Sequence, residues 1–260
     1  MENQRLAFVG GLHKSGTSLL ARCIATHPLV SSFRNTGVPE DEGQHLQSVY
    51  LPASAYGGPG KFGFDPLAHL TESSPLVSRE NRARLRTEWG RHWDIGKTLL
   101  LEKSPPNLIR ARFLQALFPE ACFVFVMRHP LAVACATQKW SRTSIQSLIE
   151  HWLACHEIFT GDLPHLRQAH VVRYEELVEA PQRTMDGVFS FLGLDSVACE
   201  LDVRPDVNAQ YVRRWLDKRR RDWVSGESSE LADLREYEGR TAALGYELNA
   251  ILALGSGGVS

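Results

Sequence analysis

The sequence has few cysteines, no long apolar run and almost no net charge. Its five cysteines form no CxxC pair and are too dispersed, and odd in number, for a disulfide framework, which favours a reducing compartment. No stretch approaches the roughly 20 apolar residues that cross a bilayer, and a glycine loop follows the first residues before a signal peptide could be completed. These absences argue against secretion and membrane spanning, and we expect a cytoplasmic protein.

The charges of the chain nearly cancel. Its 260 residues include 29 Lys and Arg against 30 Asp and Glu, with 43% hydrophobic residues, which is the composition of a folded globular protein. A net charge of -1 excludes a protein that coats nucleic acid through bulk positive charge. Any binding site for an anion must therefore be built locally, and no nucleic-acid partner is expected.

Short apolar runs alternate with segments of helical periodicity over the first three quarters of the chain. Strands are predicted at 6–9, 30–33, 98–101, 122–127 and 170–173, with helices between them. This alternation predicts an α/β fold with a mostly parallel central sheet flanked by helices, and with functional loops at the carboxyl ends of the strands. Trp93, Trp140 and Trp152 are expected to be core or helix-packing aromatics rather than a platform for stacking bases.

Beyond Gly193 the chain is more charged, and helices are predicted over 210–223 and 231–252. We see no internal repeat or linker, so the sequence predicts a single domain over residues 1–254 with a helical C-terminal part. Residues 255–260 are rich in glycine and serine and are predicted to be a flexible tail.

The strongest chemical signal is GGLHKSGTSLL, residues 10–20, between the first predicted strand and helix. Backbone amides of such a loop, together with the helix N-terminus, form a cradle for phosphate, to which Lys14, Thr17 and Ser18 can add a charge and two hydroxyls. The alternative is an ordinary glycine turn. The loop is not a Walker A motif, because Lys14 precedes Gly16 and Thr17 stands where the lysine would be; no clear Walker B acid follows.

Three segments together resemble one family. These are HKSGTS, EKSPPNLIRARFLQALFPEACFVFVMRHP (102–130) and RYEELVEAPQRTMDGVFSFLGL (173–194). In this order they are similar to the sulfotransferases that use 3'-phosphoadenosine 5'-phosphosulfate (PAPS), and among these they look closer to the tyrosylprotein and broad bacterial branch than to the cytosolic branch. The resemblance covers most of residues 5–223. It implies a sulfotransferase fold similar to that of P-loop NTPases.

The resemblance also implies where the donor binds. Its 5'-phosphosulfate falls on the loop residues His13, Lys14, Ser15, Gly16, Thr17 and Ser18, and its 3'-phosphate on Arg128. The family usually has a serine eight positions after this arginine, whereas this chain has Ala136 there. Thr137 could supply a hydroxyl, although on a helix it lies about 100 degrees further round. Asn208, Tyr211 and Trp215 resemble a family pattern near the adenine or the 3'-phosphate.

Transfer of a sulfuryl group requires a base, positive charge near the leaving phosphate, and in-line placement. By resemblance, Glu42 is the base, with His45 as the rival, and Lys103 joins Lys14 in stabilising the leaving group. A solvated acidic loop remains the alternative for Glu42, and a simple strand-end pair with Glu102 the alternative for Lys103. The segment RYEEL is expected to be architectural.

The resulting hypothesis is a sulfotransferase that moves the sulfuryl group of PAPS to a hydroxyl of a small molecule, glycan or lipid. The product would be adenosine 3',5'-bisphosphate (PAP), and no metal is required, because lysine and arginine can neutralise the transferring group. One alternative is a P-loop kinase that uses ATP and magnesium. Another is a nucleotide-binding module without catalysis, for which Ala136 is the support. The identity of the acceptor and the oligomeric state are left open.

Overall fold

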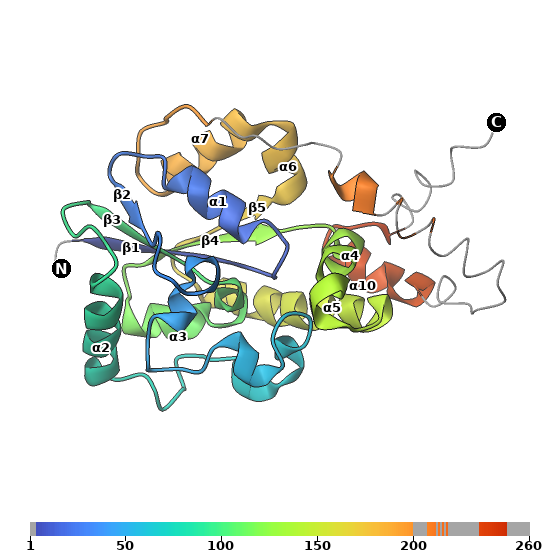
Figure 1. Ribbon diagram of the computed structural model, residues 1–260, viewed down its shortest axis with the longest axis horizontal. Helices are drawn as coiled ribbons and strands as arrows, with labels where there is room; N and C mark the ends of the chain where they lie inside the picture. Colours follow the sequence, from blue (N-terminus) through green and yellow to red (C-terminus); the bar gives the residue numbers. More distant parts are fainter. Residues whose placement is uncertain are drawn as a thin grey trace.

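A computed structural model describes residues 4–199, 207–211, 213, 215, 217 and 234–248 of the chain. At its centre is a parallel sheet of five strands in the order β2-β3-β1-β4-β5 (Figure 1). This confirms the expected fold class. The strands are β1 (Arg5–Gly11), β2 (Val30–Ser32), β3 (Leu99–Lys103), β4 (Cys122–Met127) and β5 (Ala169–Arg173).

Helices cover both faces of this sheet. In Figure 1, α1, α6 and α7 lie on one face, and α2, α3 and α5 lie on the other. The central strands are therefore buried on both sides, which explains why β4 is a continuous apolar run in which every residue is buried. The helices are α1 (Thr17–Ile24), α2 (Arg79–Gly90), α3 (Ala111–Leu117), α4 (Pro130–Ser141), α5 (Ile145–Asp162), α6 (Tyr174–Glu179), α7 (Pro181–Phe191) and α10 (Glu238–Ala243).

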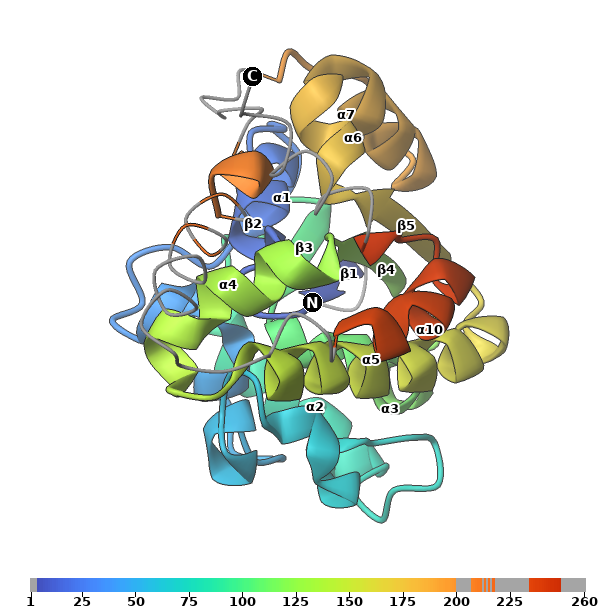
Figure 2. The same ribbon diagram turned by 90° about the vertical axis from the view of Figure 1, so that its right-hand side faces the viewer.

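The C-terminal part is described only in pieces. Residues 207–211 are helical. Helix α10 lies beside α5 (Figure 2), and Arg240 of α10 forms a bidentate ion pair with Glu157 of α5. Of the helix predicted over 210–223, the described residues 210, 211, 213, 215 and 217 are helical. The single helix predicted over 231–252 is wrong: the described residues 234–248 form the 3₁₀ turn Leu234–Tyr237, α10 and a turn at 244–245. The predicted tail at 255–260 lies outside the described residues.

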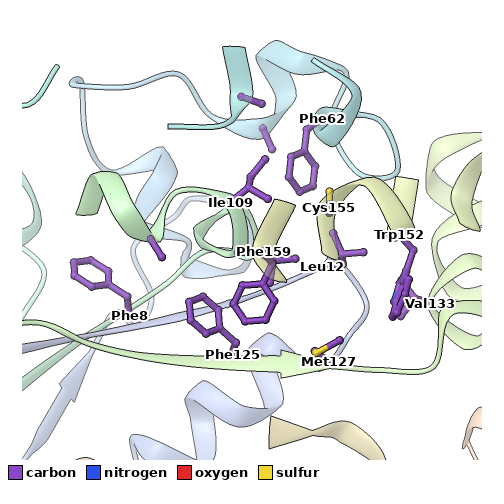
Figure 3. Close-up of a cluster of buried hydrophobic side chains, with 14 of the residues drawn as sticks. Phe8, Leu12, Phe62, Ile109, Phe125, Met127, Val133, Trp152, Cys155 and Phe159 are labelled. Carbon is purple, nitrogen blue, oxygen red and sulfur yellow. The ribbon is translucent and has the colours of Figure 1, made fainter. Parts of the chain in front are cut away.

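One expectation about packing is wrong. Trp140 is 69% exposed at the end of α4, rather than packed in the core like Trp93 and Trp152. The glycine-rich segment 52–66 forms short 3₁₀ turns and sends Phe62 into the core beside α5 (Figure 3). The sequence of each segment does not show which of its side chains will be covered by elements that lie far away in the chain.

Phe8 lies at the centre of the larger core cluster. Its ring stacks on Phe123 at 5.5 Å between centroids and contacts Trp89 and Phe118 at 5.9 and 6.1 Å. We expect Phe8→Ala to lower the free energy of unfolding by about 3–5 kcal/mol, because it removes a fully buried ring and leaves a cavity. Urea unfolding measures this change. Leu67→Ala is the control: its side chain is 71% exposed, so the midpoint of urea unfolding should stay nearly unchanged.

Candidate functional site

The register of the sheet brings three loops together at one edge. Val9 of β1 pairs with Lys103 of β3, and Gly11 of β1 pairs with Val126 of β4, so the loop after β1 lies between the ends of its two neighbours. Here a cavity of about 550 Å³ opens. Its lining includes the loop residues His13, Lys14, Gly16, Thr17 and Ser18 and, from other elements, Glu40, Glu42, Pro105, Arg128, Ala136, Tyr174 and Tyr211.

Glycines allow the loop after β1 to lie against its neighbours. A Cβ atom on Gly11 would stand 2.6 Å from the carbonyl oxygen of Val126, and one on Gly16, where φ is +107°, would stand 2.6 Å from the Tyr174 ring. Ser15 does not line the cavity: its hydroxyl and its backbone N–H both donate to the Leu12 carbonyl and hold the turn. Of the two other hydroxyls, Thr17 begins α1, and both Thr17 and Ser18 line the cavity.

Arg128 follows β4 and is almost completely buried at the cavity wall. Its Nε donates to Asn208 Oδ1 at 2.8 Å, and its Nη1 donates to the Lys14 carbonyl at 2.8 Å. The guanidinium lies 4.1 Å from the centroid of the Tyr174 ring. Burial lowers the pKa of Arg128, and Tyr174 and Glu175 oppose that shift. Within the described part of the chain, its second terminal nitrogen, Nη2, has no hydrogen-bond partner, so a buried donor is left for a ligand.

The segment after β5, expected to be mostly architectural, holds Arg128 in place. Because Met127 pairs with Arg173 in the sheet, Tyr174 falls next to Arg128. Glu175 accepts a hydrogen bond from Asn208 Nδ2 at 2.7 Å, and it thereby fixes the amide that binds the guanidinium. The signal that sequence reasoning missed was the position of this segment, directly after a strand that neighbours β4.

Ala136 and Thr137 lie on different sides of α4. Ala136 lines the large cavity. Thr137 is buried and lines a separate cavity of about 10 Å³, together with His151 and Leu148. The structure therefore does not place the Thr137 hydroxyl beside Arg128, in keeping with the rotation of about 100 degrees between successive helix residues.

Glu42 and Lys103 form a buried ion pair. The Lys103 Nζ atom lies 3.2 Å from Glu42 Oε1 and also donates to the Glu40 carbonyl at 2.9 Å. His45 is near the same carboxylate, with its Nε2 3.9 Å from Glu42 Oε2. Glu40 is exposed, and its carboxylate accepts a hydrogen bond from Ser18 at 3.2 Å. Glu42 is thus a buried group held by a cation, which argues against a freely solvated acidic loop.

The remaining loop side chains differ in charge. His13 packs edge-on against Phe62, and its pKa falls to about 3, chiefly through burial and then through the nearby charge of His151. It is therefore neutral at neutral pH. Lys14 is exposed, and its Nζ lies 4.6 Å from the centroid of the Trp140 ring. In this loop, the full positive charge comes from Lys14.

Glu102, directly before Lys103, is a second buried carboxyl. It is fully covered, and it accepts hydrogen bonds from the Ser104 hydroxyl and from Asn107 Nδ2, each at 2.5 Å. Burial raises its pKa to about 7, while these two donors and Lys103 oppose the shift. Since both Glu102 oxygens bind Ser104 and Asn107, Lys103 is left to pair with Glu42 rather than with its neighbour in sequence.

Most of the chain matches a known family. Residues 7–198 match the profile of the Sulfotransferase family, which is more than half of the chain. The chain belongs to the sulfotransferase family. The nodulation protein NoeE of Sinorhizobium fredii is a curated relative, 26% identical over 223 residues. The alignment covers 73% of this chain, but this chain spans only about half the length of that relative.

Solved sulfotransferases are similar to this chain in structure at low sequence identity. Sulfotransferase STF9 from Mycobacterium avium is 12% identical with a TM-score of 0.51, covering 83% of this chain and 68% of that one. The sulfotransferase domain of the Synechococcus PCC 7002 olefin synthase is 20% identical with a TM-score of 0.49, covering 80% and 88%. At these identities the likeness to STF9 shows the fold alone.

Among the residues that the structure describes, no group of three or more His, Cys, Asp or Glu side chains is arranged to hold a metal ion. Across the same residues, no helix combines the length and the apolar character needed to cross a membrane.

The raised pKa of Glu102 predicts a pH-dependent contribution to stability. Between about pH 4.5 and 7 the folded chain keeps a proton that the unfolded chain releases, so this group lowers the free energy of unfolding as pH rises through that window. We expect Glu102→Gln to gain stability relative to the unaltered chain over this range, by up to about 3 kcal/mol.

Urea unfolding of both proteins at several pH values measures this difference. Buried His151 and His156, with pKa values lowered to about 3 and about 4, act in the opposite sense but cancel between the two proteins. Glu120→Gln, at an exposed carboxylate, is the matched control. The prediction would be contradicted if the difference in free energy of unfolding between Glu102→Gln and the unaltered chain did not change with pH.

Proposed function

We propose that this protein transfers the sulfuryl group of PAPS to a hydroxyl of a small molecule, glycan or lipid. One observation carries the proposal: Lys14 and Arg128 line one cavity with the buried carboxylate Glu42, and Lys103, at the end of β3, pairs with that carboxylate. Membership of the sulfotransferase family supports the type of reaction. The cations match a donor with phosphate at both ends, and the carboxylate matches an acceptor that must lose a proton.

We place the donor's 5'-phosphosulfate on the loop 13–18. Backbone amides at the start of α1, the Thr17 and Ser18 hydroxyls and the Lys14 ammonium are its ligands, whereas Ser15 contributes by holding the turn. The 3'-phosphate is assigned to Arg128, because its Nη2 is a buried, unpaired donor among the described residues. Asn208 and Tyr174 orient that guanidinium, and Thr137 has no part in this assignment.

The reaction follows from this placement. The acceptor oxygen forms a bond to sulfur, and the bond between sulfur and the bridging phosphate oxygen breaks, with its electron pair leaving on PAP. The acceptor's proton passes to Glu42, and Lys14 and Lys103 neutralise the charge that develops on the leaving phosphate. PAP is the nucleotide product, and this scheme needs no metal.

Donor binding is tested by titrating PAP into the purified protein in a calorimeter, without metal. We expect binding in the unaltered chain and an affinity about 10- to 100-fold weaker for Arg128→Ala, because a charged hydrogen-bond donor to the 3'-phosphate is lost. Arg167→Ala, at an exposed arginine near the opposite end of the sheet, should bind normally. Binding of ATP only with magnesium, and none of PAP, would instead favour a kinase.

The base is tested by transfer from donor labelled in its sulfuryl group to a panel of hydroxyl acceptors. We expect Glu42→Gln to lower kcat by about 10²- to 10⁴-fold, because the amide cannot take the proton, while PAP affinity persists. His45→Ala should change kcat by less than about threefold. If His45→Ala is the damaging change, the two roles are reversed. PAP binding with no transfer to any acceptor would indicate a module without catalysis.

A further inference from the structure

We propose that Gln44 is the positioning residue for Glu42: its side-chain amide fixes the carboxylate that takes the acceptor's proton. This inference rests on the proposed function and adds a residue that sequence reasoning did not single out. Gln44 is only 2% exposed and lies two residues after Glu42, in the short 3₁₀ turn Gly43–His45. A fully buried amide is costly unless its polar atoms are bonded, so its partners show what it does.

Both ends of the Gln44 amide have partners. Its Nε2 donates to Glu42 Oε2 at 2.5 Å, and its Oε1 accepts from the backbone N–H of Ala53 at 2.8 Å. Because Ala53 N–H can only donate, it fixes the oxygen end of the amide and turns the nitrogen end toward Glu42. The hydrogen bond from Ala53 to Gln44 Oε1 therefore sets the direction in which Gln44 Nε2 points toward Glu42.

The backbone of Gln44 is anchored to the end of β3. Its N–H donates to the Ser104 hydroxyl at 2.9 Å, and that hydroxyl donates to the buried Glu102. The preceding Gly43 lies so close to Glu102 that a Cβ atom there would stand 2.4 Å from Oε1. Gly43 also accepts a hydrogen bond through its carbonyl from the Trp89 indole at 2.9 Å. The turn that carries Gln44 is therefore tied to the same strand that carries Lys103.

Glu42 is consequently held at both oxygens. Lys103 lies 3.2 Å from Oε1, and Gln44 binds Oε2, so rotation of the carboxylate would break one contact or the other. A base must lie within hydrogen-bond reach of the proton it removes, and a displacement of about 1 Å can cost as much as a hundredfold in rate. Lys103 also faces the leaving phosphate in the proposed reaction, which leaves Gln44 as the contact that serves only to orient Glu42.

The test compares two substitutions of the same type in one loop. Gln44→Met keeps the length of the side chain and removes its hydrogen bonds. Gln47→Met is the control, because Gln47 bonds the Gln44 and Tyr50 carbonyls and holds the turn without touching Glu42. For Gln44→Met we expect kcat to fall about tenfold, with PAP affinity and the acceptor KM changed less than about threefold. Gln47→Met should keep kcat within about threefold.

A double substitution separates positioning from a general structural role. If Gln44 acts through Glu42, Glu42→Gln combined with Gln44→Met should be no slower than Glu42→Gln alone. Gln44→Asn should show the same loss of kcat, because its amide is one methylene too short to bridge Ala53 and Glu42. This variant serves as the test if Gln44→Met does not fold. A crystal structure of the folded variant should show Glu42 displaced from Lys103.

Three results would overturn the inference. They are an unchanged kcat in the Gln44 variants, an equal loss in Gln47→Met, or losses that multiply in the double variant. Each can be seen while the unaltered chain binds PAP and transfers sulfuryl groups. Absence of PAP binding in the unaltered chain would instead remove the proposed function itself, so the two failures are distinguishable.

Discussion

The register of β1 between β3 and β4 is the constraint on which the rest of the site depends. It places the loop after β1, Lys103 and Arg128 at one edge of the sheet, although they lie far apart in the sequence. The loop can approach its neighbours only because Gly11 and Gly16 lack a Cβ atom. The Lys14 carbonyl then accepts a hydrogen bond from Arg128, so the two ends of the proposed donor site are joined through the protein itself.

The buried carboxyl groups near this edge each have local partners. Glu42 pairs with Lys103, while Glu102 satisfies its oxygens through Ser104 and Asn107 instead of through its sequence neighbour. This division matters because an unpaired buried charge is far more costly than a paired one. It also gives the two adjacent residues of β3 different tasks, since Glu102 holds the turn at 43–45 through Ser104 and Lys103 pairs with Glu42 at the cavity wall.

Much of the fold could be predicted because strands buried on both faces are continuous apolar runs and their loops have recognisable glycines. The clustering of Lys14, Lys103 and Arg128 could also be predicted, because each follows or ends a predicted strand and the carboxyl ends of parallel strands lie at one edge of the sheet. The contacts of Gln44 could not be predicted, because they depend on Ala53 and Ser104, which only tertiary packing brings near. The exposure of Trp140 and the separate cavity of Thr137 depend likewise on how α4 is rotated against its neighbours.

The contact between Lys14 and the exposed Trp140 gives the protein a built-in optical reporter. The Trp140 indole lies outside the core with an ammonium over its face, whereas Trp89, Trp93 and Trp152 are buried and each donates its indole N–H to a backbone carbonyl. An anion that draws Lys14 away would change the electrostatic field at this ring while leaving the buried indoles as they are. Occupancy of the loop should therefore register in the intrinsic fluorescence of the chain, without a dye or a label.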